Sequence, residues 1–274
     1  LEFHTRFADF RFTIHNSMIM TTKKISCVAQ RLFHLPIVAA DDHQMGHGAH
    51  WNYSDSTGPT HWHCLSEEYA LCDSGKRQSP IDITESIKAD LPALVFNYRP
   101  IPLIIENNGH TIQITTPEAG ELKIGDEAYQ LQQFHFHTPS EEAIHGKRTD
   151  MVIHLVHQNA QGELAVVAVL LEKGHLANSF IETLWNVMPN APGKPQHHDE
   201  VSIDINQLLS MDNQNYYTFA GSLTTPPCTE GVKWFILKQT VPFSEGQLAQ
   251  FKAVCGENAR PLQPLNDRQV FSSD

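Results

Sequence analysis

Apolar runs of strand length recur along the chain from about residue 100 onward, and breaks rich in Pro, Gly and Asn separate them. The run Leu164–Leu171 is apolar at every position, which is typical of a central strand covered on both faces. Two stretches, Ser179–Met188 and Ser244–Val254, favour helices, and Ser244 and Gln247 have the spacing of a capping box. The other runs predict strands at Leu103–Glu106, His110–Thr115, Tyr129–His137, Val152–His157 and Val232–Gln239.

The length of 274 residues allows one large domain or two small ones, and β-rich architectures of this size are routinely single domains. We therefore expect one domain. The polar, glycine-containing stretch 41–62 predicts a surface arm that Trp51 and Trp62 anchor, so the compact part begins near Trp51.

The amino-terminal segment resembles a secretory leader. Met20 is followed by two lysines, an apolar stretch and the small pair Ala39–Ala40, although polar residues interrupt the apolar stretch. Residues 1–19 precede this start, and we expect them to be upstream-translated or foreign sequence. We expect 1–45 to be a leader, a disordered tail or a foreign extension and 46–274 to be the domain, with export to the periplasm or outside the cell.

Charge and cysteine content exclude several classes of protein. The chain has 19 basic and 31 acidic residues, and its net charge of -12 argues against nucleic acid or an anionic membrane as a partner. No run of about 18 apolar residues occurs, so we expect no transmembrane helix. A cysteine-rich structural zinc site is not supported because no CxxC pair occurs, while one or two disulfides stay open. The cysteines are Cys27, Cys64, Cys72, Cys228 and Cys255.

The stretch QFHFHTPSEE, residues 133–142, places two histidines one residue apart at the end of a predicted strand. Because strand side chains alternate, His135 and His137 share a face with Gln133. His154 occupies one face of the next predicted strand and could complete a set of three. Three imidazoles with an open fourth position are typical of catalytic zinc, whereas any single histidine is more simply a hydrogen-bonded core residue.

Further motifs occur in a fixed order: HWNYSDSTGPTHW, GKRQSPIDI, NNGH, QFHFHTPSEE, HLVH, LAVVAVLL, GSLTTPPCTEGVKWFIL and ARPLQPLNDRQ. Over nearly all of Trp51–Val270 the chain resembles α-class carbonic anhydrases of the bacterial periplasmic type. Several ordered motifs are far more specific than HxH alone. The resemblance implies a mainly β (α+β) fold with a large, mostly antiparallel, twisted central sheet, short peripheral helices and zinc in a conical cavity.

By this resemblance the three histidines match the family's Zn²⁺ ligands, and hydroxide on the metal attacks carbon dioxide to give bicarbonate. Thr224 matches the residue whose hydroxyl accepts a hydrogen bond from that hydroxide. Glu141 matches the buried carboxylate that accepts the threonine's own proton, and Thr225 matches a contact to bicarbonate. The implied partners are the small molecules carbon dioxide and bicarbonate, and a homodimer is left open.

The resemblance also assigns the substrate pocket and the proton path. His110 matches the proton shuttle, for which a pKa near 6.5 is suited, and Tyr53 matches a tyrosine that orders the water chain. Gln133 and Asn108 match a polar wall. The apolar wall for carbon dioxide, whose members would be equally good core residues, is matched by Val156, Val166, Leu223, Val232 and Trp234.

Two positions depart from the family's pattern. Val152 stands where the family usually has a Glu that accepts the ring N–H of the third zinc histidine, and Glu142 stands where it usually has His. We hypothesise an exchange in which Glu142 accepts the N–H of His154, directly or through water. The alternative is a solvated Glu142, with a backbone carbonyl or water serving His154.

The resemblance to bacterial members further implies a disulfide between Cys72 and Cys228, with the other three cysteines unpaired. The competing functions are a catalytically silent binding module on the same fold and hydrolysis of activated esters. A silent module is expected to lack a zinc ligand or the threonine at 224, and this chain retains both.

Overall fold

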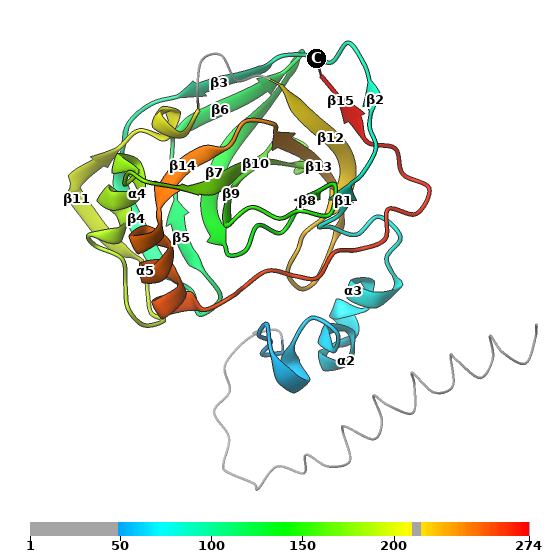
Figure 1. Cartoon of the computed structure of the whole chain (residues 1–274), viewed down its shortest axis with the longest axis horizontal. Helices are drawn as coiled ribbons and strands as arrows, with labels where there is room; N and C mark the ends of the chain where they lie inside the picture. Colours follow the sequence, from blue (N-terminus) through cyan, green and yellow to red (C-terminus); the bar gives the residue numbers. More distant parts are fainter. Residues whose placement is uncertain (1–48, 210–214, 274) are drawn as a thin grey trace, which may run out of the picture. The chain divides into compact units, whose positions relative to one another are not determined.

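The structure is a computed structural model that describes residues 49–209 and 215–273. The leader predicted at 1–45 lies outside the described residues. In the described part of the chain, thirteen strands form one large sheet (Figure 1). No helix in that part is long and apolar enough to cross a membrane.

The strands β1 to β8 are Asp82–Ile83, Ile87–Lys88, Leu94–Tyr98, Ile101–Asn107, Ile112–Thr115, Gly120–Ile124, Glu127–His137 and Ala143–Ile144. The strands β9 to β15 are Met151–Gln158, Leu164–Gly174, Gln196–Ile203, Tyr216–Ser222, Glu230–Leu237, Val241–Ser244 and Phe271–Ser272. The helices are α2 Trp62–Leu65, α3 Leu71–Ser74, α4 Ser179–Trp185 and α5 Glu245–Cys255, with 3-10 turns η1 Asp55–Thr57, η2 Glu67–Tyr69 and η3 Ile205–Leu208.

The strand order of the large sheet is β11-β4-β5-β7-β9-β10-β13-β12-β15-β2. Three strands lie off this path: β6 pairs with β7, β3 pairs with β6, and β14 pairs with β10. Most pairs are antiparallel, while β10 pairs in parallel with β13 and β14, and β15 with β2. This confirms the predicted fold class. The order makes β7 and β9 neighbours, so the two histidine-bearing strands lie side by side near the middle of the sheet.

Each predicted strand coincides with an observed one, with shifts at the ends. The strand predicted from His110 begins at Ile112, because Asn108 Oδ1 accepts hydrogen bonds from the amides of His110 and Thr111 and turns the chain there. The α5 helix carries the predicted Ser244 capping box. The sequence did not predict β3, β6, β11 or β12; β11 is an exposed edge strand of mostly polar residues, which carries no alternation signal.

Strand β10 is buried on both faces, as its uninterrupted apolar run predicts. In β10, Val167 and Val169 join the larger core, which α4 and α5 help to cover. Val166 and Ala168 point to the opposite face and join a second core that contains Trp234. Of the two histidine strands, β9 also contributes side chains to both cores, and β7 contributes to the larger core.

The amino-terminal part of the described chain is anchored as predicted. Trp62 is fully buried and packs with Tyr69 and the disulfide between Cys72 and Cys228. Cys64 is also disulfide-bonded, which corrects our expectation that it is unpaired.

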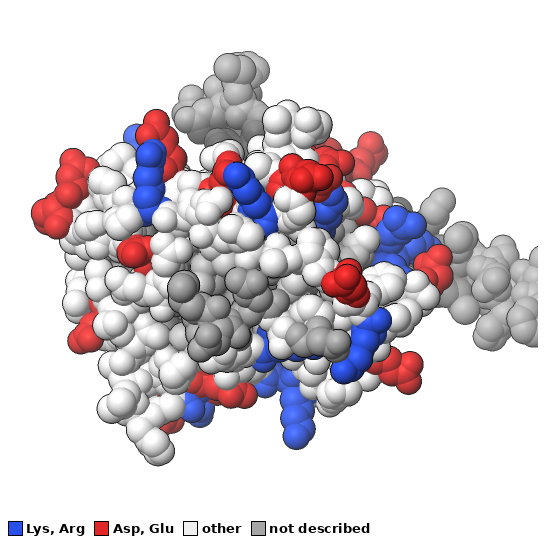
Figure 2. All heavy atoms as spheres, turned by 90° about the horizontal axis from the view of Figure 1, so that it is seen from above, with Lys and Arg blue, Asp and Glu red and all other residues white. Residues whose placement is uncertain are grey.

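Acidic and basic side chains are interspersed on the face seen in Figure 2, so that face has no broad patch of positive or of negative charge.

Candidate metal centre

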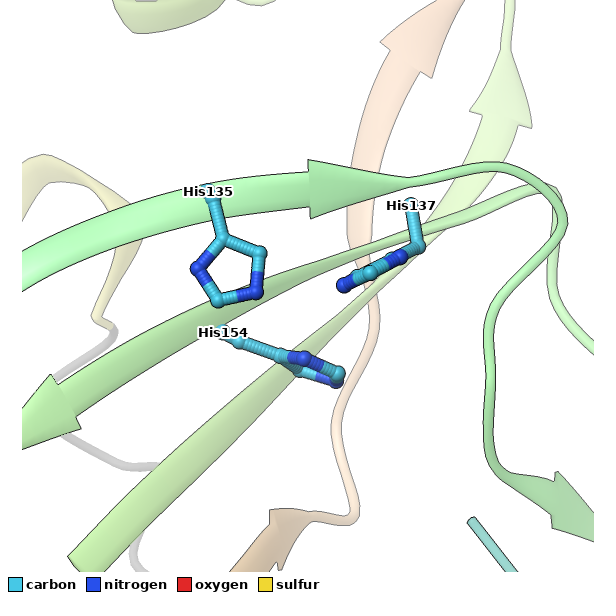
Figure 3. A group of neighbouring side chains, drawn as sticks. All are labelled: His135, His137 and His154. Carbon is cyan, nitrogen blue, oxygen red and sulfur yellow. The ribbon is translucent and has the colours of Figure 1, made fainter. Parts of the chain in front are cut away.

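Three imidazoles converge from the paired strands β7 and β9. The register places His135 opposite His154, and His137 shares a face with His135 (Figure 3). Their ligating nitrogens all lie within 4.8 Å of one another. Among the described residues this is the one cluster of three or more potential metal ligands.

Hydrogen bonds to fixed acceptors set the tautomers of the first two histidines. His135 Nδ1 lies 2.8 Å from Gln133 Oε1, and because an amide oxygen only accepts, Nδ1 carries the proton. His137 Nδ1 donates in the same way to the carbonyl of Asn258 at 2.7 Å. His137 Nε2 is buried and has no hydrogen-bond partner in the described part of the chain. The Nε2 atoms of His135 and His137 therefore carry no proton, and both direct a lone pair toward the same point.

His154 is held by a carboxylate. Its Nε2 lies 3.3 Å from Glu142 Oε1 and 3.4 Å from Oε2, so Nε2–H donates and Nδ1 presents the lone pair. The Glu142 side chain is buried rather than solvated. Val152, two residues before His154 on the same face of β9, is also buried and offers no polar atom.

The surroundings favour the neutral form of two of the three imidazoles, which is the form that binds a metal ion. Burial, followed by the neighbouring imidazoles, lowers the pKa of His135 well below its usual value, and burial also lowers the pKa of His137. Burial alone would lower the pKa of His154, but the charge and hydrogen bond of Glu142 outweigh it and raise that pKa. A set of three nitrogen ligands with an orphaned buried lone pair fits zinc.

A second buried carboxylate faces the cluster. Glu141 Oε1 accepts a hydrogen bond from the Arg260 amide at 2.7 Å. Its Oε2 has no hydrogen-bond partner among the described residues and lies 3.6 Å from His137 Nε2 and 3.9 Å from His154 Nδ1. One oxygen is therefore fixed by the backbone, and the other is free to accept.

The segment with the two threonines, residues 223–229, is braced at both ends. Leu223 N donates to Thr229 O at 2.9 Å, and Cys228 N donates to Thr225 O at 2.8 Å. Thr224 is buried and Thr225 is half-buried.

The predicted apolar wall forms one cluster. Trp234 is buried in the second core, and its ring centroid lies 4.9 Å from that of His154. The other members pack in the same core, either fully or partly buried: Val156, Val166, Leu223 and Val232. The metal cluster thus has an apolar surface directly beside it.

His110 lies outside the metal cluster, on the loop between β4 and β5. Its ring stacks on Trp51, with centroids 3.7 Å apart and planes 5° from parallel. Burial, with a smaller contribution from His50, lowers the pKa of His110. Asn108, expected on the polar wall, is exposed and shapes this loop through its Oδ1.

Tyr53 packs against Trp51 and Trp62, with ring centroids 5.6 and 5.9 Å away. Burial, with the charge of Glu141, raises the pKa of Tyr53 well above its usual value, so its hydroxyl keeps its proton at physiological pH.

Sequence reasoning missed two buried residues that support the site. Asn258 provides the acceptor for His137, and the Arg260 amide holds Glu141. Both follow α5, more than a hundred residues after the histidine strands. Asn258 acts on His137 through a backbone carbonyl, which leaves no signal in side-chain chemistry.

A family model described as eukaryotic-type carbonic anhydrase matches residues 57–274. A carbonic anhydrase of Neisseria gonorrhoeae is 46% identical over 228 residues, which cover 82% of this chain and 89% of the relative. The chain belongs to the α-class carbonic anhydrase family. A carbonic anhydrase of Klebsiella pneumoniae is 44% identical over 226 residues, covering 81% of this chain and 91% of the relative.

The fold agrees with solved carbonic anhydrases. The α-carbonic anhydrase of Thermovibrio ammonificans, solved in complex with the inhibitor sulfanilamide, superposes with a TM-score of 0.78 at 43% identity. The match covers 82% of this chain and all of that structure. This chain is accordingly a zinc-dependent carbonic anhydrase, with the three histidines as its metal site.

Proposed function

We propose that this carbonic anhydrase hydrates carbon dioxide at the three-histidine site and exports the released proton through His110. The observation that carries the proposal is the set of fixed tautomers: each imidazole donates one ring N–H to a protein acceptor and turns its other nitrogen to a common point. When bound there, zinc supplies a Lewis acid that lowers the pKa of a water molecule to about 7, the value established for carbonic anhydrases.

Thr224 and Glu141 orient the attacking oxygen in this proposal. The Thr224 hydroxyl accepts a hydrogen bond from the nucleophile only if its own proton points elsewhere, and the free Oε2 of Glu141 is a buried acceptor for that proton. The Arg260 amide holds the other oxygen of Glu141, so the carboxylate cannot rotate freely. The directed hydrogen-bond chain leaves one lone pair of the nucleophile aimed at the substrate.

The apolar cluster beside His154 receives carbon dioxide, which is small and has no net dipole to satisfy. Trp234 and Val166 provide a dry surface there, so no protein hydrogen bond is lost when the gas enters. Thr225, on the braced segment next to Thr224, contacts the charged product, bicarbonate. Gln133, whose oxygen is occupied by His135, lines the polar side.

Proton export uses His110. Its pKa is lowered by burial, so at neutral pH the imidazole is mostly neutral and ready to accept a proton, and it then releases that proton easily to buffer. Tyr53 keeps its own proton and serves as a fixed hydrogen-bonding group for water between the metal and His110.

Export from the cytoplasm is also part of the proposal. Disulfides form and persist in oxidising compartments, so the disulfide between Cys72 and Cys228 supports a location in the periplasm or the extracellular space.

The test compares two strand histidines. His135→Ala removes one ligand, so bound zinc and carbon dioxide hydration should be lost together. His157→Gln is the matched control, because His157 lies on β9 but bonds Tyr98 and the Ala165 carbonyl instead of facing the cluster. Stoichiometric zinc and an unchanged hydration rate in His135→Ala would refute the proposal.

A further inference from the structure

A buried asparagine connects the metal strand to the loop that carries His110. Asn258 is fully buried after the end of α5. Its Nδ2 donates to the carbonyls of His110 at 3.0 Å and of Phe136 at 2.9 Å. Its Oδ1 accepts from the Thr138 amide at 2.8 Å, and its own carbonyl accepts from His137 Nδ1 at 2.7 Å.

The side-chain amide of Asn258 uses almost all of its hydrogen-bonding groups. An asparagine side chain has two N–H donors and one acceptor oxygen, and here both donors and the oxygen are engaged with main-chain groups. Removing the donors would leave the half-buried carbonyl of His110 without its Asn258 partner.

The other bonds of the loop act differently. Asn108 Oδ1 accepts from the His110 and Thr111 amides, which fixes the shape of the loop but not its position on the sheet. The hydroxyl of Thr111, the next residue, donates to the Phe136 carbonyl and accepts from the Phe136 amide, which anchors the start of β5 to the metal strand. The His110 main chain itself is tied to the metal strand through Asn258.

We propose that the Asn258 side chain is a positioning residue that fixes His110 relative to the metal ligand His137, and thereby sets the path over which protons leave. This inference rests on the proposed role of His110. Proton transfer through ordered water depends on distance and orientation, and a misplacement of 1 Å can cost about 100-fold in rate. Asn258 thus couples the chemistry at the metal to proton export without touching either reactant.

The experiment uses Asn258→Ala and Asn258→Asp in the full-length, zinc-loaded enzyme. The aspartate variant has the same size, keeps the acceptor for the Thr138 amide and has at most one donor, so at least one of the two bonds made by Nδ2 is lost even if the alanine variant does not fold. Asn206→Ala is the matched control, because Asn206 Nδ2 donates to the Tyr98 carbonyl away from the metal cluster.

We expect hydration at low buffer concentration to fall about 10-fold in both Asn258 variants and to recover when imidazole is added, with no such buffer dependence in Asn206→Ala. In a His110→Ala background, Asn258→Asp should cause no further loss at low buffer, because the two changes remove the same step. A full additional loss in that background, or a low-buffer rate equal to that of the unaltered enzyme, would overturn the proposal.

A second readout separates this proposal from the shuttle itself. Amide hydrogen exchange at residues 109–111 should become faster in Asn258→Asp and stay unchanged in Asn206→Ala. If His110→Ala alone leaves low-buffer turnover unaffected, the shuttle assignment fails, and the exchange rates then decide whether Asn258 positions the loop. Unchanged exchange there would overturn the positioning role.

Discussion

Replacing Glu142 by alanine should weaken the hold on zinc, because His154 would lose the acceptor that fixes its tautomer and ring orientation. In the structure the carboxylate is buried and both of its oxygens lie 3.3 to 3.4 Å from His154 Nε2. No other protein acceptor for this nitrogen occurs among the described residues. The alanine variant would leave a buried N–H unpaired beside the metal.

The size of the effect follows from the geometry. Loss of such a partner typically costs about 10- to 100-fold in metal affinity or activity, which corresponds to about 1.4 to 3 kcal/mol. Optimal charge-assisted N–H···O bonds measure about 2.7 to 2.9 Å, and the distances here are longer. We therefore expect an effect near 10-fold.

The assay is zinc release into an excess of chelator, followed at fixed pH. Glu142→Ala should release zinc about 10-fold faster than the unaltered protein, and Glu142→Gln, which can still accept through its amide oxygen, should lie between them. Adding Val152→Glu to Glu142→Ala should slow release again, because residue 152 shares the His154 face of β9. Val152→Glu alone should destabilise the fold, since two buried carboxylates would then compete for one N–H.

An unchanged release rate in Glu142→Ala would refute the reasoning. A crystal structure of that variant in which a water or backbone carbonyl takes the place of the carboxylate, with zinc affinity intact, would show that the alternative acceptor suffices.

Three further predictions concern proton export and stability. His110→Ala should keep zinc but slow hydration in dilute buffer about 10-fold or more, with recovery on adding imidazole; an unchanged rate in stopped-flow would remove His110 from the mechanism. Cys72→Ser with Cys228→Ser opens a loop of 156 residues and should lower the free energy of unfolding by roughly 2 to 4 kcal/mol in urea titrations, whereas equal midpoints would contradict this. Burial lowers the pKa of His157 to about 4. The unfolded chain, with a pKa near 6.5, therefore binds the extra proton, and stability should fall by up to about 3 kcal/mol as the pH drops from 6.5 to 4. His157→Gln should show a shallower decline over that range, and an equally steep one would argue against this cause.

Alternation along the strands predicted much of the site. His135 and His137 share a face because they are two residues apart, and the register between β7 and β9 brings His154 opposite. Side chains alternate between the two faces of any strand, so the residues that share a face can be read directly from the sequence. The edge strand β11 was missed because it is polar on both faces and owes its structure to pairing with β4.

The supporting contacts are less accessible to sequence reasoning. Glu142 is next to Glu141 in the chain, and both face His154, yet Glu142 lies beside its Nε2 whereas Glu141 lies nearer its Nδ1 and is held by the Arg260 amide. Asn258 and Arg260 hold His137 and Glu141 through main-chain atoms. Every residue type has a main-chain carbonyl, and every type except proline has an N–H, so only the folded structure shows which positions use them.

The central claim is that the three histidines hold one zinc ion that is required for carbon dioxide hydration. The most direct measurement is stopped-flow hydration by the full chain after zinc removal with a chelator, followed by titration with zinc. The account predicts negligible hydration by the zinc-free protein and a linear recovery that ends at one zinc per chain. Full hydration without zinc, or recovery that requires two ions per chain, would contradict it.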